Sequence, residues 1–192
     1  MLDKNKKSMR LTGYDYSMPG YYFITICTHE MQYFFGECAD GIMKLNKFGE
    51  IVKNELLKTP KIRPGIILDE FTIMPNHIHV ITVITDSGKL PLFPAVGIDS
   101  YQSLQNRYGP QYRNLFSIIR GFKGATTKQI NILRDALGNP VWQTRFYDHI
   151  IRDKESLINI REYIKNNPAN WERDSKNHEN FSNELKDILK KK

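Results

Sequence analysis

The stretch MPNHIHVI, residues 74–81, sets two histidines two positions apart in a run that is otherwise typical of a buried strand. Side chains alternate between the two faces of a strand, so His77 and His79 are expected to point to the same face. Two imidazoles on one rigid face form half of a metal site. Because a histidine pair identifies neither the metal nor the reaction, the function depends on the missing ligand and on the group that the metal activates.

Two strands and an amphipathic helix are predicted before the histidine strand. Aromatic and β-branched residues favour a buried strand at 21–28, and the sequence GIMKLN indicates a short strand at 41–46. Apolar residues at helical spacing predict a helix over 47–58 that stops before Pro60. A further strand over 65–73 leads directly into the histidine strand, so these two strands are expected to be adjacent and antiparallel.

The second half of the chain is expected to return to the same sheet. Its segments are distinguished by proline and glycine content, by apolar residues at helical spacing, and by bulky residues that favour a strand. The predicted elements are a long surface loop over 87–113, a long helix over 115–137 weakened around Gly121 and Gly124, a strand over 141–152, and a last helix from the capping residue Asp153 to Asn167, before Pro168.

The order strand, helix, strand, strand, helix, strand, helix is that of the split ferredoxin-like pattern with one added C-terminal helix. The expected fold class is therefore α+β, with a ferredoxin-like (RRM-like) antiparallel sheet, helices on one face and an additional C-terminal helix. We expect a single domain over residues 21–168, preceded by a basic arm at 1–20 and followed by a polar, basic tail at 169–192.

The composition narrows the class of protein. Lys and Arg outnumber Asp and Glu by 28 to 21, which suits a polyanionic partner, although many basic proteins bind no nucleic acid. Cys27 and Cys38 form no CxxC pair, so neither a disulfide framework nor a structural zinc site is indicated. No apolar run has the roughly 18 residues of a membrane span. We expect a cytoplasmic protein.

The last predicted helix offers candidates for the missing groups. Tyr163 and Asn167 are four residues apart, which places them on one face of a helix. The amide oxygen of Asn167 is a hard ligand, and together with two imidazole nitrogens it would leave a divalent ion with open positions for substrate oxygens. The hydroxyl of Tyr163 would then stand next to those positions.

Beyond these separate features, the chain resembles the bacterial single-tyrosine HUH transposases of the insertion-sequence type, and especially the REP-associated tyrosine transposases. The resemblance runs from LTGYDYSMPGYYFITICT to IKNNPANW. It is carried by the motifs MPNHIHVI, FSIIRGFKGATTKQIN, NPVWQTRFYDHIIRD and INIREYIKNNPANW, in this order and spacing.

This resemblance implies that the protein cuts and rejoins single-stranded DNA, typically at the foot of a hairpin, through a covalent 5′-phosphotyrosine intermediate. His77 and His79 match the histidine pair of the family, Tyr163 matches its nucleophile, and Asn167 matches its third metal ligand, where some relatives have Gln. Mg²⁺ or Mn²⁺ suits such an oxygen-completed site. The covalent intermediate stores the bond energy, and the sequence has no P-loop, so no nucleotide cofactor is expected.

Holding DNA while its backbone is open requires contacts to phosphates and bases. The candidates for phosphate contacts are Arg120, Lys123 and Lys128 of the long helix, Arg145 and Arg152 around the last strand, and Lys4, Lys6, Lys7 and Arg10 of the arm. Tyr14, Tyr16, Tyr21 and Tyr22 are candidates for stacking on unpaired bases, and His149 for positioning the scissile phosphate. When bound to DNA, the protein would be associated with the nucleoid.

Several alternatives stay open at this level. Tyr147 is a rival nucleophile, although an aromatic residue in a strand usually serves packing. The chain could be a relative that binds hairpins without cutting them, or a metal-dependent phosphohydrolase that uses bound water; no Asp or Glu cluster accompanies the histidines to favour the latter. The family that the chain resembles includes monomers as well as homodimers that exchange the tyrosine helix.

Overall fold

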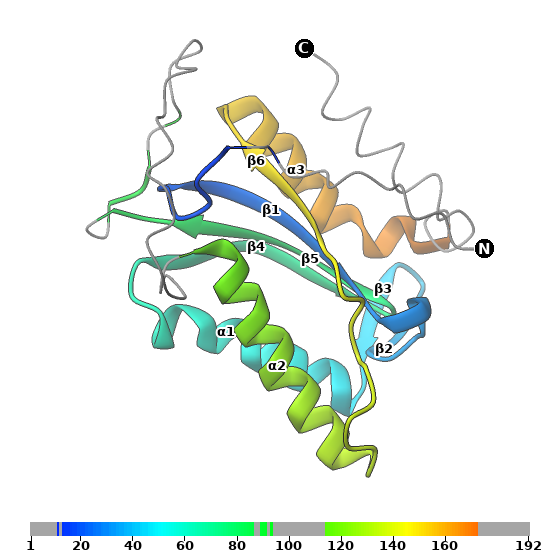
Figure 1. Ribbon diagram of the computed structural model, residues 1–192. Coiled ribbons are helices and arrows are strands. Elements are labelled where there is room, and N and C mark those ends of the chain that lie inside the picture. Colours follow the sequence, from blue (N-terminus) through cyan, green and yellow to red (C-terminus); the bar gives the residue numbers. More distant parts are fainter. Residues whose placement is uncertain (1–10, 12, 87–88, 92, 94–113, 173–192) are drawn as a thin grey trace, which may run out of the picture.

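Four antiparallel strands form the central sheet of the computed structural model, in the spatial order β4-β5-β1-β6 (Figure 1). The structure describes residues 11, 13–86, 89–91, 93 and 114–172. The strands are β1 (Gly20–Cys27), β4 (Ile66–Met74), β5 (His77–Ile84) and β6 (Tyr147–Ile151). Together with the helices, this sheet confirms the predicted ferredoxin-like α+β class.

The histidine strand β5 lies in the interior of the sheet, between β4 and β1. All eight of its residues are buried. The predicted antiparallel pairing of β4 with β5 is confirmed, since Met74 lies opposite His77 across a turn of Pro75 and Asn76. A strand with neighbours along both edges and a layer on each face holds its side chains firmly in place.

Helices cover both faces of the sheet (Figure 1). On one face, α1 (Lys47–Ile62) and α2 (Leu115–Leu133) pack through residues such as Val52 and Ile118. On the opposite face, α3 (Lys154–Asn166) packs through residues such as Ile160. The additional C-terminal helix was predicted, and the structure places it across the sheet from α1 and α2.

The ends of the helices are set by local side chains. Asp153 caps α3 as predicted, because its Oδ1 accepts a hydrogen bond from the backbone N–H of Ser156 at 2.8 Å. The predicted end of α1 before Pro60 is wrong, since the helix continues to Ile62. A proline in the last turn removes one N–H donor without ending a helix that packs against α2 and β4.

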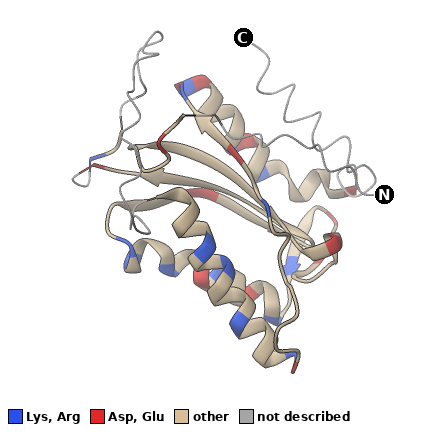
Figure 2. Ribbon diagram, in the orientation of Figure 1, with Lys and Arg blue, Asp and Glu red and all other residues tan. Residues whose placement is uncertain are grey.

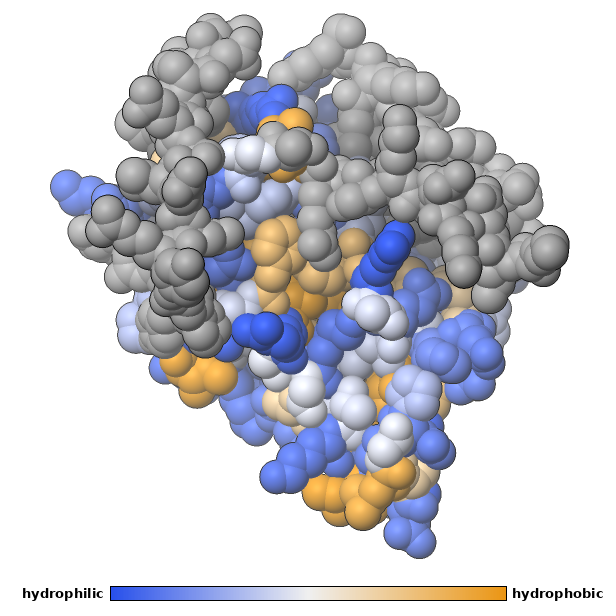
Figure 3. Space-filling model, viewed as in Figure 1, coloured by the Kyte–Doolittle hydropathy of each residue, from blue (hydrophilic) through white to orange (hydrophobic). Residues whose placement is uncertain are grey.

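The long helix α2 is continuous through Gly121 and Gly124, so these glycines do not interrupt it. It is also shorter than predicted, because it ends at Leu133. The side chains of Ile132, Leu133 and Leu137 are exposed. Figure 3 shows hydrophobic surface at this end of the molecule.

A hairpin of β2 (Gly36–Ala39) and β3 (Ile42–Leu45) forms a separate two-stranded sheet. Only its second strand was predicted. Asp40 and Gly41 form the turn with φ of 53° and 71°, the left-handed geometry of a two-residue hairpin loop. The strand predicted over 141–152 is correct only for β6, since Trp142 contributes an isolated bridge to Thr28 rather than a ladder.

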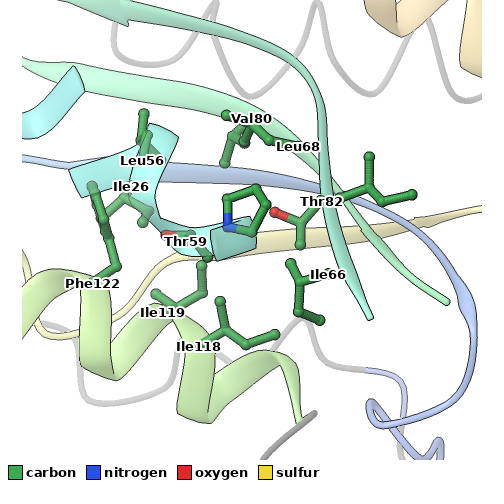
Figure 4. Close-up of a pocket in the computed structure, with 12 residues that line it drawn as sticks. Ile26, Leu56, Thr59, Ile66, Leu68, Val80, Thr82, Ile118, Ile119 and Phe122 are labelled. Carbon is green, nitrogen blue, oxygen red and sulfur yellow. The ribbon is translucent and has the colours of Figure 1, made fainter. Parts of the chain in front are cut away.

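The cavity between the sheet and the α1–α2 layer is small and mostly apolar (Figure 4). Its volume of about 20 Å³ is enclosed by side chains that include Ile26, Leu56, Val80, Ile118 and Phe122. This space holds at most about one water molecule, so the α1–α2 side of the sheet is a packed core.

Residues 1–10 and 12 of the predicted arm at 1–20, most of the predicted loop at 87–113, and residues 173–192 of the predicted tail at 169–192 lie outside the described residues. The part of the tail that is described continues from α3 through the short 3₁₀ segment η2 (Pro168–Asn170) to the buried Trp171. No helix in the described part of the chain is long and apolar enough to cross a membrane.

Candidate active site

His77 and His79 point to the face of the sheet that α3 covers. Thr25 of β1 lies opposite His79, and Cys27 lies opposite His77; residues that pair across antiparallel strands share a face. Both imidazoles are buried, and their ring centroids are 4.6 Å apart. The structure therefore agrees with the predicted placement of the pair on one face.

Each imidazole is oriented by a hydrogen bond at its Nδ1 atom. Oδ1 of Asn76 lies 2.8 Å from Nδ1 of His77; because a carboxamide oxygen only accepts, this Nδ1 carries the hydrogen and donates. Oγ1 of Thr25 lies 2.8 Å from Nδ1 of His79, and a hydroxyl either donates or accepts. The lone pair of His77 is therefore on Nε2, and Thr25 permits the same arrangement in His79.

The two Nε2 atoms converge to 3.0 Å. Nitrogen ligands about 2.1 Å from one ion and at right angles to each other are about 3.0 Å apart, so this spacing fits a shared divalent ion. Burial, and then the neighbouring His77, holds the pKa of His79 well below its usual value, and a neutral ring is the form that binds metal.

The other ligands would differ in type from those of a structural zinc site. Among residues 11–172 with the gaps given above, no three His, Cys, Asp or Glu side chains gather closely enough to hold a metal. A third ligand from this part of the chain would therefore carry another oxygen donor, such as an amide. The donor set of two imidazoles and an amide fits a divalent ion that completes its coordination with substrate oxygens.

Tyr163 extends from α3 toward the histidine pair. Its hydroxyl lies 3.3 Å from Nε2 of His79, and its ring meets that imidazole edge-on with centroids 5.2 Å apart. The ring of Phe23 packs against Tyr163 as well, at 6.3 Å between centroids. The structure thus brings together the tyrosine and a histidine that the sequence singled out, while their roles as nucleophile and ligand stay predictions.

Asn167 lies one helical turn beyond Tyr163, at the C-terminal end of α3. It is buried, at 3% exposure, and has helical backbone angles. Trp171 follows four residues later, and its ring lies 6.1 Å from that of His77. Because residues four apart share one side of a helical segment, Asn167 faces the sheet between the contacts of Tyr163 with His79 and of Trp171 with His77. This position suits the predicted third ligand.

The rival tyrosine, Tyr147, occupies a different place on the same face. It pairs with Thr25 from β6, so the whole of β1 separates it from His79. Its ring packs edge-on against Phe23 at 6.2 Å. Burial, and then the nearby Asp148 carboxyl, raises the pKa of Tyr147. These features favour Tyr147 as a packing residue and Tyr163 as the candidate nucleophile.

The predicted DNA-binding residues of α2 lie across the sheet from Tyr163. Figure 2 shows Lys and Arg along α1 and α2 on that far layer. Arg120 and Lys128 are exposed there. Nζ of Lys123 is already engaged, because it donates to the backbone carbonyls of Gln143 and Thr144. These two hydrogen bonds would compete with the predicted contact between Lys123 and a DNA phosphate.

The predicted stacking tyrosines are largely part of the core. Tyr16, Tyr21 and Tyr22 are buried, so their expected contact with unpaired bases is wrong. Tyr14 is half-buried and packs edge-on against Tyr16 at 5.1 Å. Aromatic side chains in an interior strand usually pack in the core, where they cannot stack on a ligand.

The remaining DNA-binding candidates are scattered. Arg145 and Arg152 flank β6 and are exposed, and His149 of β6 lies opposite Phe23 on the α3 face. Arg10, Lys4, Lys6 and Lys7 lie outside the described residues. The structure therefore places Tyr163 beside His79 and His77, with Asn167 one helical turn further along, whereas the basic candidates in the described part of the chain lie on α2 or flank β6.

Two residues that orient the imidazoles were missed by sequence reasoning. Asn76 precedes His77 in the turn, and its capacity to accept from Nδ1 could have been inferred from its position in MPNHIHVI. Thr25 lies 54 residues from His79 in the chain, so only the strand register brings it there. Trp171 also packs beside His77.

Comparison with known proteins places this geometry in context. No model of a protein family matches the chain. An uncharacterized protein of Haemophilus influenzae is 37% identical over 174 residues, which cover 88% of this chain and 92% of that protein. Among solved structures, a REP-associated tyrosine transposase bound to a REP hairpin has a TM-score of 0.53 and 18% identity, with 85% of this chain and 73% of that chain covered. The fold is thus the one found in a tyrosine transposase.

Proposed function

The chain belongs to the same protein family as the Haemophilus influenzae protein, and from its transposase fold and site geometry we propose that it is a metal-dependent DNA transposase. In this proposal it nicks and rejoins single-stranded hairpin DNA through a covalent 5′-phosphotyrosine intermediate. The observation that carries the proposal is the distance of 3.3 Å between the Tyr163 hydroxyl and Nε2 of His79, one of two imidazoles whose Nε2 atoms converge to 3.0 Å.

In the proposed site, three side chains would hold the metal ion and two others orient the histidines. His77 and His79 would hold Mg²⁺ or Mn²⁺ through their Nε2 atoms, and Asn167 through its amide oxygen. A divalent ion bound there would withdraw charge from a phosphodiester and neutralise the charge that develops during its cleavage. Asn76 and Thr25 keep the imidazoles in place through their Nδ1 atoms.

The proposed reaction needs one nucleophile, and it retains the energy of the broken phosphodiester bond in a phosphotyrosine bond. The Tyr163 oxygen forms a bond to phosphorus while the bond from phosphorus to the 3′-oxygen breaks, and the tyrosine proton is lost as the 3′-oxygen gains one. A 5′-phosphotyrosine and a free 3′-hydroxyl result. Attack by a 3′-hydroxyl on the phosphotyrosine reverses the step and rejoins the DNA, so no nucleotide cofactor is consumed.

The proposal is tested with labelled single-stranded oligonucleotides. Because the transposase with this fold is described as bound to a REP hairpin, hairpins from repeats that flank the gene are the first substrates to use. We expect a nick that depends on Mg²⁺ or Mn²⁺ and a protein–DNA adduct that survives denaturing electrophoresis. Binding without any cleavage would favour a hairpin-binding protein instead, and repeated cleavage without an adduct would favour a phosphohydrolase.

A further inference from the structure

A β-bulge interrupts β4, the edge strand that lies beneath α3. The register with β5 shifts between Leu68 and Phe71, because Leu68 lies opposite Thr82 and Phe71 opposite Val80. Three steps along β4 therefore match two along β5, so one extra residue is accommodated. Leu68 and Phe71 both pack into the core on the α1–α2 side.

This bulge gives β4 two consecutive carboxylates between Leu68 and Phe71. In a regular strand, neighbouring side chains point to opposite faces, and only one residue fits between two that share a face. The extra residue allows both Asp69 and Glu70 to reach the α3 side. Their contacts confirm this, since both carboxylates pair with basic side chains of α3.

The two ion pairs are unequal. Arg161 makes a bidentate contact with Asp69, with Nε and Nη2 donating to the two carboxylate oxygens at 2.9 and 2.8 Å. Lys165 lies one turn later, and its Nζ is 3.4 Å from Glu70 in a more exposed pair. A bidentate guanidinium–carboxylate pair fixes both distance and orientation, whereas an exposed lysine pair fixes little. The Arg161–Asp69 contact is therefore the main anchor.

The Arg161–Asp69 anchor and Tyr163 lie on the same short helix, α3. Ile160 and Ile164 attach α3 to the apolar face of the sheet, but apolar contacts allow a helix to slide or rotate. The bidentate pair restricts both motions, and Tyr163 lies two residues after Arg161. A displacement of about 1 Å at a reacting group is enough to slow a reaction by about a hundredfold.

We propose that the acidic bulge of β4 anchors α3 and so holds Tyr163 at the histidine pair of its own chain, with Arg161 and Asp69 as positioning residues. This inference rests on the proposed function, because it assigns the anchor a role in the rate of DNA attack. It predicts that losing the anchor slows attack while leaving the binding of DNA unchanged.

Two variants distinguish an effect on the position of Tyr163 from an effect of charge on DNA affinity. Arg161→Met removes a positive charge, and Asp69→Asn removes a negative one, so their direct effects on DNA affinity have opposite signs. We expect both to slow single-turnover adduct formation by about tenfold or more, with Kd for the oligonucleotide within about twofold of wild type. Lys58→Met is the matched control, because it breaks the Lys58–Glu55 pair on α1, across the sheet from α3.

Amide hydrogen exchange gives a readout that does not depend on DNA cleavage. In Arg161→Met, we expect faster exchange in α3, at Ile160 and Ile164, with no change in α1, whereas Lys58→Met leaves α3 as in wild type. If wild-type protein forms no adduct, the proposed function fails, and the exchange measurement still decides whether the anchor holds the helix. Adduct rates equal to wild type in both anchor variants, or unchanged exchange in α3, would overturn the inference.

Discussion

The hydroxyl of Tyr163 lies 3.3 Å from Nε2 of His79, although 84 residues separate them in the chain. The two residues come from elements of different character. His79 belongs to an interior strand that is buried along its whole length, and Tyr163 belongs to a helix that covers that strand from one side. The rigid element thus supplies the candidate ligands, and the covering helix supplies the candidate nucleophile.

Replacing either histidine is expected to abolish stabilisation by metal. A ligand that binds only the folded state raises stability by about 2.7 kcal/mol at a hundred times its Kd. Mn²⁺ should therefore raise the Tm of the wild-type protein, and this increase should be absent in His77→Ala and His79→Ala. His29→Ala serves as the control, because the His29 imidazole is partly exposed and lies outside the pair. An equal shift in His79→Ala and wild type would exclude the pair as ligands.

Asn167→Ala is expected to weaken Mn²⁺ binding by about tenfold or more, because a ligand is lost from a site with few protein donors. The matched control is Asn166→Ala, which changes the same residue type one position earlier, where the side chain is exposed. Isothermal titration in the absence of DNA measures both affinities. If the two variants bind Mn²⁺ equally well, Asn167 is a structural residue.

Thr25→Val tests how His79 is oriented. The change keeps the shape of the side chain but removes the hydroxyl that bonds to Nδ1 of His79. Losing a partner that orients a ligand typically weakens metal affinity about 10- to 100-fold. Thr82→Val is the control, since Thr82 is also buried but lines the small cavity on the opposite face. Equal affinities in the two variants would contradict the assigned role of Thr25.

Two glycines in helices are expected to respond to alanine with opposite signs. A Cβ at Gly49 of α1 would clash with the backbone carbonyl oxygen of Phe35, so Gly49→Ala should destabilise the fold by about 2 kcal/mol or more. A Cβ at Gly124 of α2 would meet no atom within 4 Å, and Gly124→Ala should stabilise it by about 0.5–1 kcal/mol. Urea unfolding measures both, and a stable Gly49→Ala protein would contradict the packing described between α1 and Phe35.

The strands of the main sheet and the helices that cover it could be predicted, because each carries a clear hydrophobic pattern. The β2–β3 hairpin was missed in part because its strands are short and half-exposed, although the Asp40–Gly41 turn is a recognised hairpin signal. Pro60 was misjudged because packing against α2 and β4 outweighs one lost hydrogen bond. Local sequence patterns therefore predicted which helices and strands form better than they predicted where these elements end.

The candidate site was predictable in its residues but not in its supports. His77 and His79 follow from strand alternation, and Tyr163 and Asn167 from helical spacing and the family resemblance. Asn76, the partner of His77, is its neighbour in the chain, but Thr25, the partner of His79, and the anchor of α3 depend on strand register and on a bulge, which no local pattern in the sequence determines. The sequence also could not show which basic and aromatic side chains are free to contact DNA. Lys123 is hydrogen-bonded to a backbone carbonyl, and Tyr22 is fully buried.

The most direct test of the account is to identify the tyrosine that becomes attached to DNA. Wild-type protein, Tyr163→Phe and Tyr147→Phe are incubated with a labelled hairpin oligonucleotide and Mn²⁺, and the adduct is digested and mapped by mass spectrometry. We predict an adduct on the peptide that contains Tyr163, its retention in Tyr147→Phe, and its loss in Tyr163→Phe. An adduct formed by Tyr163→Phe at the wild-type rate would contradict the central claim.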